Sequence, residues 1–148
     1  MHSAIGREPE LRRRRKTSMQ DIKSEYELRA DAMGRIGARL AACRKAATRR
    51  TGGVDDFAAA AARELADLDP GTLPLAAQTI WTDKVARPLR ADPAKPLSET
   101  DVAGLRSWPS ARLRQLVRAL REIERIVKED EIDARNEIIR ATISREYS

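Results

Sequence analysis

Apolar residues recur at alternating spacings of four and three through the first third of the chain. The series runs Ile22, Tyr26, Met33, Ile36, Leu40, Cys43 and Ala47, with Arg29 filling its one gap. This heptad pattern is typical of an amphipathic helix that packs against other helices. Ser18 and Asp21 have the spacing of a capping box, so we expect the helix to begin at Ser18. Gly52 and Gly53 are expected to end it.

Two shorter helical patterns follow. Residues 55–68 begin with acidic groups and are rich in alanine, as expected of a capped helix. A third helix is predicted from Pro74 to the residue before Pro88. The stretch 88–97 holds several prolines, which indicate a stiff linker and the best candidate for a domain boundary.

The final segment restarts the helical pattern with two reinforcing signals. Ser98 and Asp101 form a second capping box, and Leu97 and Val102 have the spacing of a hydrophobic staple. The triplet 107–109, Ser-Trp-Pro, is expected to interrupt this helix. A long helix then carries Leu113, Leu116, Val117, Leu120, Ile123 and Val127, after which the apolar positions shift to Ile132, Ile138, Ile139 and Ile143. The shift indicates a bend or a change of packing partner.

These patterns predict an all-α protein in four parts. They are a flexible basic arm (1–17), a three-helix region (18–87), a proline-rich linker (88–97) and a helical hairpin with a long C-terminal helix (98–148). Aromatic residues make up only 3% of the chain and alanine supplies much of its apolar content. Because alanine buries little area, we expect modest stability alone and a benefit from partner helices.

The distribution of charge indicates the kind of partner that the protein binds. The formal net charge is +6, and the positive excess lies in residues 1–54. It includes a basic run in the arm: Arg12, Arg13, Arg14, Arg15 and Lys16. A clustered positive field attracts polyanions such as DNA and RNA. The abundance of arginine and alanine also points to a GC-rich, bacterial genome.

Residues 97–120, LSETDVAGLRSWPSARLRQLVRAL, resemble the helix-turn-helix motif of bacterial DNA-binding proteins. Val102 and Ala103 match the apolar and small residues of its first helix. Trp108 matches the apolar residue after the turn, and Leu113 and Leu116 match the packing positions of its second helix. Two residues depart from the motif: Arg106 stands at an apolar position and Ser107 where glycine is favoured.

The resemblance implies that the outer face of the second helix contacts DNA. That face would present Ser110, Arg112, Arg114, Gln115 and Arg118. Arginine pairs with guanine and glutamine with adenine in the major groove, and further arginines hold phosphates. Arg114, Arg118, Arg121 and Arg125 also form one stripe. The alternative is a plain helical bundle whose arginines are solvated or pair with carboxylates.

The chain has few residues suited to catalysis or to metal binding. Cys43 is the one cysteine and His2 the one histidine, so a Cys/His zinc site within one chain is excluded. Glu129, Asp133 and Glu137 form a row of carboxylates on one helical face. Arg125–Glu129 and Glu131–Arg135 are ready ion pairs at a spacing of four, and no second helix supplies further metal ligands. We therefore expect no cofactor, no metal and no enzymatic activity. The absence of a long apolar run or secretory signal predicts a cytoplasmic protein without membrane contact.

The leading hypothesis is a non-enzymatic, helical nucleic-acid-binding protein, such as an accessory or regulatory subunit of a nucleoprotein assembly. DNA is favoured over RNA. The predicted contacts are Arg12, Arg13, Arg14, Arg15, Lys16, Arg112, Arg114, Gln115, Arg118 and Arg121. The alternative is a helical adaptor or scaffold whose arginine stripes pair with a partner's carboxylates. A homodimer or a helical protein partner is compatible with either hypothesis.

Overall fold

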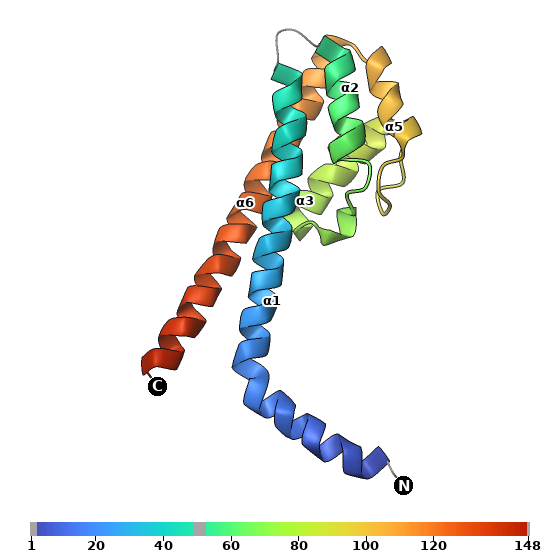
Figure 1. The fold of residues 1–148 in the computed structure, drawn as a ribbon. Coiled ribbons are helices and arrows are strands. Elements are labelled where there is room, and N and C mark those ends of the chain that lie inside the picture. Colours follow the sequence, from blue (N-terminus) through green and yellow to red (C-terminus); the bar gives the residue numbers. More distant parts are fainter. Residues whose placement is uncertain (1–2, 49–52, 148) are drawn as a thin grey trace. The chain divides into compact units, whose positions relative to one another are not determined.

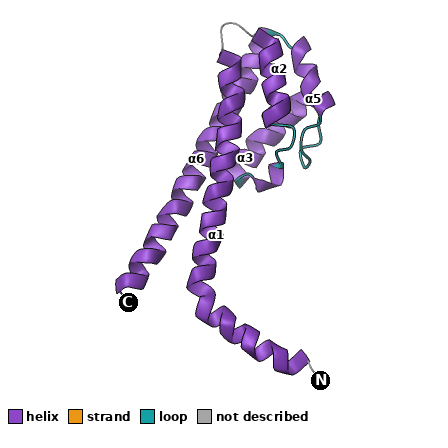
Figure 2. Ribbon diagram, in the orientation of Figure 1, coloured by secondary structure: helices purple, strands orange, loops and turns teal. Residues whose placement is uncertain are grey.

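The structure is a computed structural model that describes residues 3–48 and 53–147, with side chains in 24–48 and 53–146. Every regular element in this part of the chain is helical, which confirms the all-α prediction (Figure 2). In chain order the elements are α1 (Ser3–Thr48), α2 (Gly53–Glu64), η1 (Pro70–Thr72), α3 (Leu75–Ile80), η2 (Trp81–Ala86), α4 (Arg87–Leu89), α5 (Glu99–Ala103), η3 (Gly104–Ser107) and α6 (Ser110–Tyr147). None of the described helices is both long and apolar enough to cross a membrane.

The chain forms two compact units. The larger unit is residues 32–130, and the smaller combines Met1–Asp31 with Glu131–Ser148. The long helices α1 and α6 contribute to both units. The proline-rich stretch 88–97, which was predicted as a domain boundary, lies within residues 32–130 and so inside the larger unit. Its last residue, Leu97, is buried in that unit's core, which ties the stretch to the helices on either side.

The first helix begins earlier than predicted. α1 starts at Ser3, so Ser18 and Asp21 lie within the helix and do not cap it. The preceding residues are mainly alanine, glutamate, leucine, arginine and lysine, which are strong helix formers. Segment 1–17 is thus largely helical where an irregular arm was expected. The side chains of the basic run, Arg12 to Lys16, lie outside the described residues.

The core of the larger unit is built on the contact between α1 and α6 (Figure 1). Its buried members include Met33, Ile36, Leu40 and Cys43 from α1 and Leu116, Leu120, Ile123 and Val127 from α6. The two helices approach closely at Gly37, where an added Cβ would lie 3.7 Å from Val127 Cγ1. Phe57 of α2 and Trp81 of η2 add the largest side chains to the same cluster. The heptad series of α1 is therefore an internal packing surface.

The third helical segment runs past Pro88, whereas the sequence predicted an end before it. α3 continues through the π-helical turn η2 into α4. In this wider turn the Arg87 N–H donates to the carbonyl of Thr82, five residues back. Proline lacks an amide hydrogen and crowds the carbonyl four residues before it, and a π turn relieves that crowding. The segment ends at Arg90, whose φ of 58° is left-handed.

The capping box before α5 is confirmed. Asp101 N–H donates to Ser98 Oγ at 3.1 Å, and Ser98 N–H donates to Asp101 Oδ2 at 3.0 Å. Leu97 and Val102 are both buried, as the staple prediction requires. η3 then ends at Ser107 and Trp108 is extended, the conformation favoured before proline. These local signals fix where α6 begins.

Replacing Ser98 with alanine should lower the free energy of unfolding by about 1 kcal/mol, because Asp101 N–H loses its capping acceptor. Urea unfolding followed by circular dichroism measures the change. Thr100→Ala, at an exposed position of the same turn, is the matched control and should change stability by less than about 0.5 kcal/mol. Equal losses in both variants would contradict a capping role.

Candidate nucleic-acid interface

The N-terminal half of α6 carries the predicted contact residues on its outer face. Arg112, Arg114, Gln115, Arg118 and Arg121 are all exposed. They point outward because Leu116, Leu120 and Ile123 of the same helix are buried in the core. The structure therefore brings together the α6 members of the predicted site. The Arg12–Lys16 members lie outside the described side chains.

Three of these arginines are aligned along α6. Arg114, Arg118 and Arg121 make no ion pair with any carboxylate in the described part of the chain. They are spaced four and three residues apart and so share one side of the helix. We call this set the arginine stripe. Its charges repel one another, which favours the approach of an anion.

Other arginines near the stripe are neutralised within the fold. Arg44 of α1 donates Nε and Nη2 to the carboxylate of Glu124 at 2.8 and 3.2 Å, and this hydrogen bonding raises the pKa of Arg44. Arg125 pairs with Glu129 at 2.9 Å, as its spacing predicted. These two arginines are therefore less available to an external anion than the stripe.

The predicted pair of Glu131 and Arg135 is also present. In the smaller unit, Arg135 lies 3.9 Å from the Glu131 carboxylate. Like Arg125 and Glu129, these residues are four positions apart on one helix. The local alternative of carboxylate pairing, which the sequence left open, is thus realised for part of the basic surface of α6.

Arg112 has a different environment. Its guanidinium carbon lies 4.5 Å from the centre of the Trp108 ring, a cation–π contact between the start of α6 and the residue before Pro109. Trp108 is itself half-buried against the core. The stacking holds the Arg112 guanidinium in place and leaves its charge uncancelled, so Arg112 remains a candidate contact beside the stripe.

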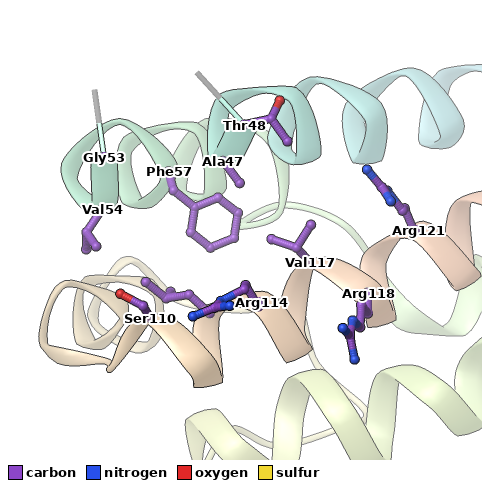
Figure 3. A pocket seen from close by; sticks show the side chains of 11 residues that line it. Ala47, Thr48, Gly53, Val54, Phe57, Ser110, Arg114, Val117, Arg118 and Arg121 are labelled. Carbon is purple, nitrogen blue, oxygen red and sulfur yellow. The ribbon is translucent and has the colours of Figure 1, made fainter. Parts of the chain in front are cut away.

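An open groove runs along the stripe. It has a volume of about 370 Å³ and an apolar floor. Figure 3 shows Phe57 of α2 and Val117 of α6 between the helices, with Arg114, Arg118 and Arg121 along α6. The lining residues are Ala47, Thr48, Gly53, Val54, Phe57, Ser110, Leu113, Arg114, Val117, Arg118 and Arg121. An anion that carries flat apolar groups fits this combination of charge and surface.

A second hollow of about 660 Å³ shares Arg118 with the groove. Its charged and polar lining includes Lys84, Arg87, Arg112, Gln115 and Arg118, together with the carboxylates of Asp83 and Glu122. Arg87 lies 3.5 Å from Asp83 and is partly neutralised by it. Each side of this hollow carries two basic groups and one carboxylate, so η2 and α4 together contribute as much positive charge as α6.

The apolar residues of segment 97–120 contribute to the core of the larger unit. Val102 and Leu116 are buried, and Trp108 and Leu113 pack against the core. The two departures from the motif occupy η3 and its end. Arg106 is exposed and lies 3.9 Å from Asp55 of α2, and Ser107 Oγ donates to the Gly104 carbonyl at 2.9 Å. A 3₁₀ turn thus stands where the motif has a glycine turn.

The single cysteine of the chain lies in the core. Cys43 is fully buried, and this burial raises the pKa of its thiol to about 12. A nucleophilic cysteine needs a thiolate near neutral pH, which this environment opposes. Within the described residues, no group of three or more histidine, cysteine or acidic side chains is arranged to hold a metal ion.

The α1 and α2 residues of the groove were not predicted. Ala47, Val54 and Phe57 come from helices far from α6 in the sequence. The sequence marked Phe57 only as part of a helix, and no spacing rule connects it with Val117. Comparisons with protein-family models, curated proteins and solved structures found no match to the chain.

In the folded protein Cys43 should resist thiol reagents. With a pKa of about 12, roughly one Cys43 thiol in 10,000 is ionised at pH 8. We expect negligible reaction with a chromogenic disulfide reagent at pH 8, and one thiol per chain reacting promptly in denaturant. Fast labelling of the native protein would contradict the buried position of this residue.

Proposed function

We propose that the protein is a non-enzymatic nucleic-acid-binding protein that contacts its ligand through the outer face of α6. The observation that carries the proposal is the arginine stripe: Arg114, Arg118 and Arg121 are exposed, aligned and without a carboxylate partner in the described part of the chain. DNA is the favoured ligand, because the segment that carries the stripe resembles a helix-turn-helix reader.

The contrast within one helix supports this assignment. Arg125 lies on the same side of α6 as the stripe but is paired with Glu129 at 2.9 Å. A purely structural surface would gain by pairing Arg114, Arg118 and Arg121 in the same way. Three clustered guanidinium groups raise one another's electrostatic energy, and a phosphate backbone relieves that repulsion while releasing counterions.

The surroundings of the stripe suit a nucleic acid in particular. The guanidinium forks can hold phosphate oxygens, and the exposed Gln115 amide can reach a base edge. The apolar floor formed by Phe57 and Val117 can contact sugar or base surfaces. A non-catalytic role agrees with Cys43, whose raised pKa of about 12 leaves it without nucleophilic character at neutral pH.

A second candidate is a protein-interaction module. The same groove has an apolar floor and a basic rim, which would accept an amphipathic helix with acidic flanks. In that case Arg114 and Arg118 would pair with carboxylates of the partner. Indifference of the chain to DNA at low salt would favour this candidate.

Replacing Arg114, Arg118 and Arg121 together with alanine should weaken binding to duplex DNA. If each arginine neutralises one phosphate, the slope of log affinity against log salt becomes shallower by about 0.9 per arginine. Alanine keeps the helix intact because it has the highest helix propensity. Fluorescence anisotropy with labelled duplex DNA across a salt series measures both quantities.

The matched control removes the same charge elsewhere. Arg35, Arg63 and Lys95 are exposed and lie on α1, on α2 and in the stretch before α5. Joint replacement of these three residues with alanine should reduce the affinity for DNA less than the stripe variant does. Most of the slope of log affinity against log salt should remain. Equal losses in the two triple variants would show that net charge drives binding, and would contradict a site on α6.

The basic run provides a separate test. Replacing residues 12–16 with alanine should flatten the salt dependence further if these side chains contact phosphates, by up to about 0.9 in slope for each contact. The loss should add to that of the stripe variant, because distant sites act independently. An unchanged slope would remove the run from the interface and leave the α6 assignment standing.

A further inference from the structure

The last turns of α6 carry large apolar side chains on the outside of the smaller unit. Ile132 is 46% exposed, Ile139 55% and Ile143 49%. By contrast Ala134, on the inward face of the same segment, is 1% exposed. Ile138 is half-buried, whereas the other three isoleucines at the shifted apolar positions face solvent.

These isoleucines form a heptad seam. With Asn136 they occupy successive positions at spacings of four, three and four: Ile132, Asn136, Ile139 and Ile143. That alternation is the pattern of a helix that pairs with another helix along one line. An asparagine in such a seam weakens association. We call these four residues the C-terminal seam.

The described side chains of the smaller unit, in residues 24–31 and 131–146, include few buried groups. These are Ala30, Glu131 and Ala134. Two alanines bury little apolar area, while a buried isoleucine contributes roughly 1.5–3 kcal/mol. Leu28 of the same unit is also exposed, at 71%. Burial of the three isoleucines against a further helix would therefore be favourable.

We propose that the C-terminal seam binds the same seam of a second copy of this chain, as an antiparallel helix pair. The charges beside the seam identify a second copy as the occupant. Asp133 and Arg140 flank the seam on one side, at corresponding positions seven residues apart, and Arg140 also pairs with Glu137 of its own helix at 2.7 Å. A two-fold axis through the middle of the seam places Asp133 of each copy beside Arg140 of the other.

The parallel arrangement lacks this complementarity. In a parallel pair, Arg135 of one copy would lie beside Arg140 of the other, and the two like charges would repel. The segment is also more acidic in its first half, with Glu131, Asp133 and Glu137, and more basic towards Arg145. Antiparallel pairing brings these halves together and opposes the two helix dipoles.

The seam is short, so the dimer should be weak. Pairing about the two-fold axis gives four core layers, and in two of them Asn136 of one copy faces Ile139 of the other, so the interface lies at the small end of specific contacts. We expect a dissociation constant on the order of 1–100 μM. Sedimentation equilibrium of the full chain, without nucleic acid and over a concentration series at physiological ionic strength, measures it. A chain that stays monomeric up to several hundred micromolar would overturn the proposal.

Ile139→Asp tests whether the seam forms the contact. Placing a carboxylate in the seam should raise the dissociation constant at least about tenfold. Ser144→Asp puts the same charge on an exposed position away from the seam and should leave it within about twofold. Circular dichroism checks that both variants keep the helical content of the parent. A dimer that Ile139→Asp leaves unchanged would use another surface and refute the proposal.

Charge reversal tests the orientation. Arg140→Asp and Asp133→Arg should each weaken the antiparallel dimer severalfold, and the double variant should recover most of the loss. The parallel arrangement gives the opposite result for Arg140→Asp, since the new carboxylate would lie beside Arg135. A tighter Arg140→Asp dimer would therefore contradict the antiparallel pair.

Discussion

The contact between α1 and α6 in the larger unit determines the direction of the candidate functional side chains on α6. Leu116, Leu120, Ile123 and Val127 must turn inward to meet the buried stripe of α1. Gly37 of α1 lies opposite Val127 at this contact. Once that face of α6 is buried, geometry leaves Arg114, Arg118 and Arg121 on the outside.

The outward-facing residues of α6 change from charged to apolar along the helix. Positions 118, 125, 132 and 139 follow one another at a spacing of seven, and they are Arg, Arg, Ile and Ile in turn. The first half of the helix thus presents charge and the second half presents apolar surface. We propose that the first half contacts a polyanion and the second half a second copy of the chain.

Local signals explain which parts of the fold were predictable. Three features that depend on sequence neighbours were predicted correctly. They are the heptad series of α1, the capping box of Ser98 and Asp101, and the interruption at Pro109. The box at Ser18 has the same spacing, yet strong helix formers on both sides carry α1 through it. The continuation of the helix past Pro88 was not predicted. It depends on the wider π-helical turn η2, which no residue pattern in the sequence indicated.

The candidate site also has parts that local spacing predicted and parts that it did not. The arginines of α6 were found from spacing on one helix, and the pairing of Arg125 with Glu129 from the same rule. The apolar floor was not found, because Phe57 and Val117 meet only through the packing of α2 against α6. The partner of Arg44 was equally inaccessible, since Glu124 lies 80 positions away in the chain.

The central claim is that this chain binds nucleic acid through electrostatic contacts. The most direct test is the binding of the unmodified protein to labelled duplex DNA and to a matched RNA, measured by fluorescence anisotropy over a range of salt concentrations. The account predicts binding at low salt, tighter for DNA, with log affinity falling linearly as log salt rises. No binding to either ligand at low salt would contradict it, and would leave Arg114, Arg118 and Arg121 as the rim of a protein-binding groove.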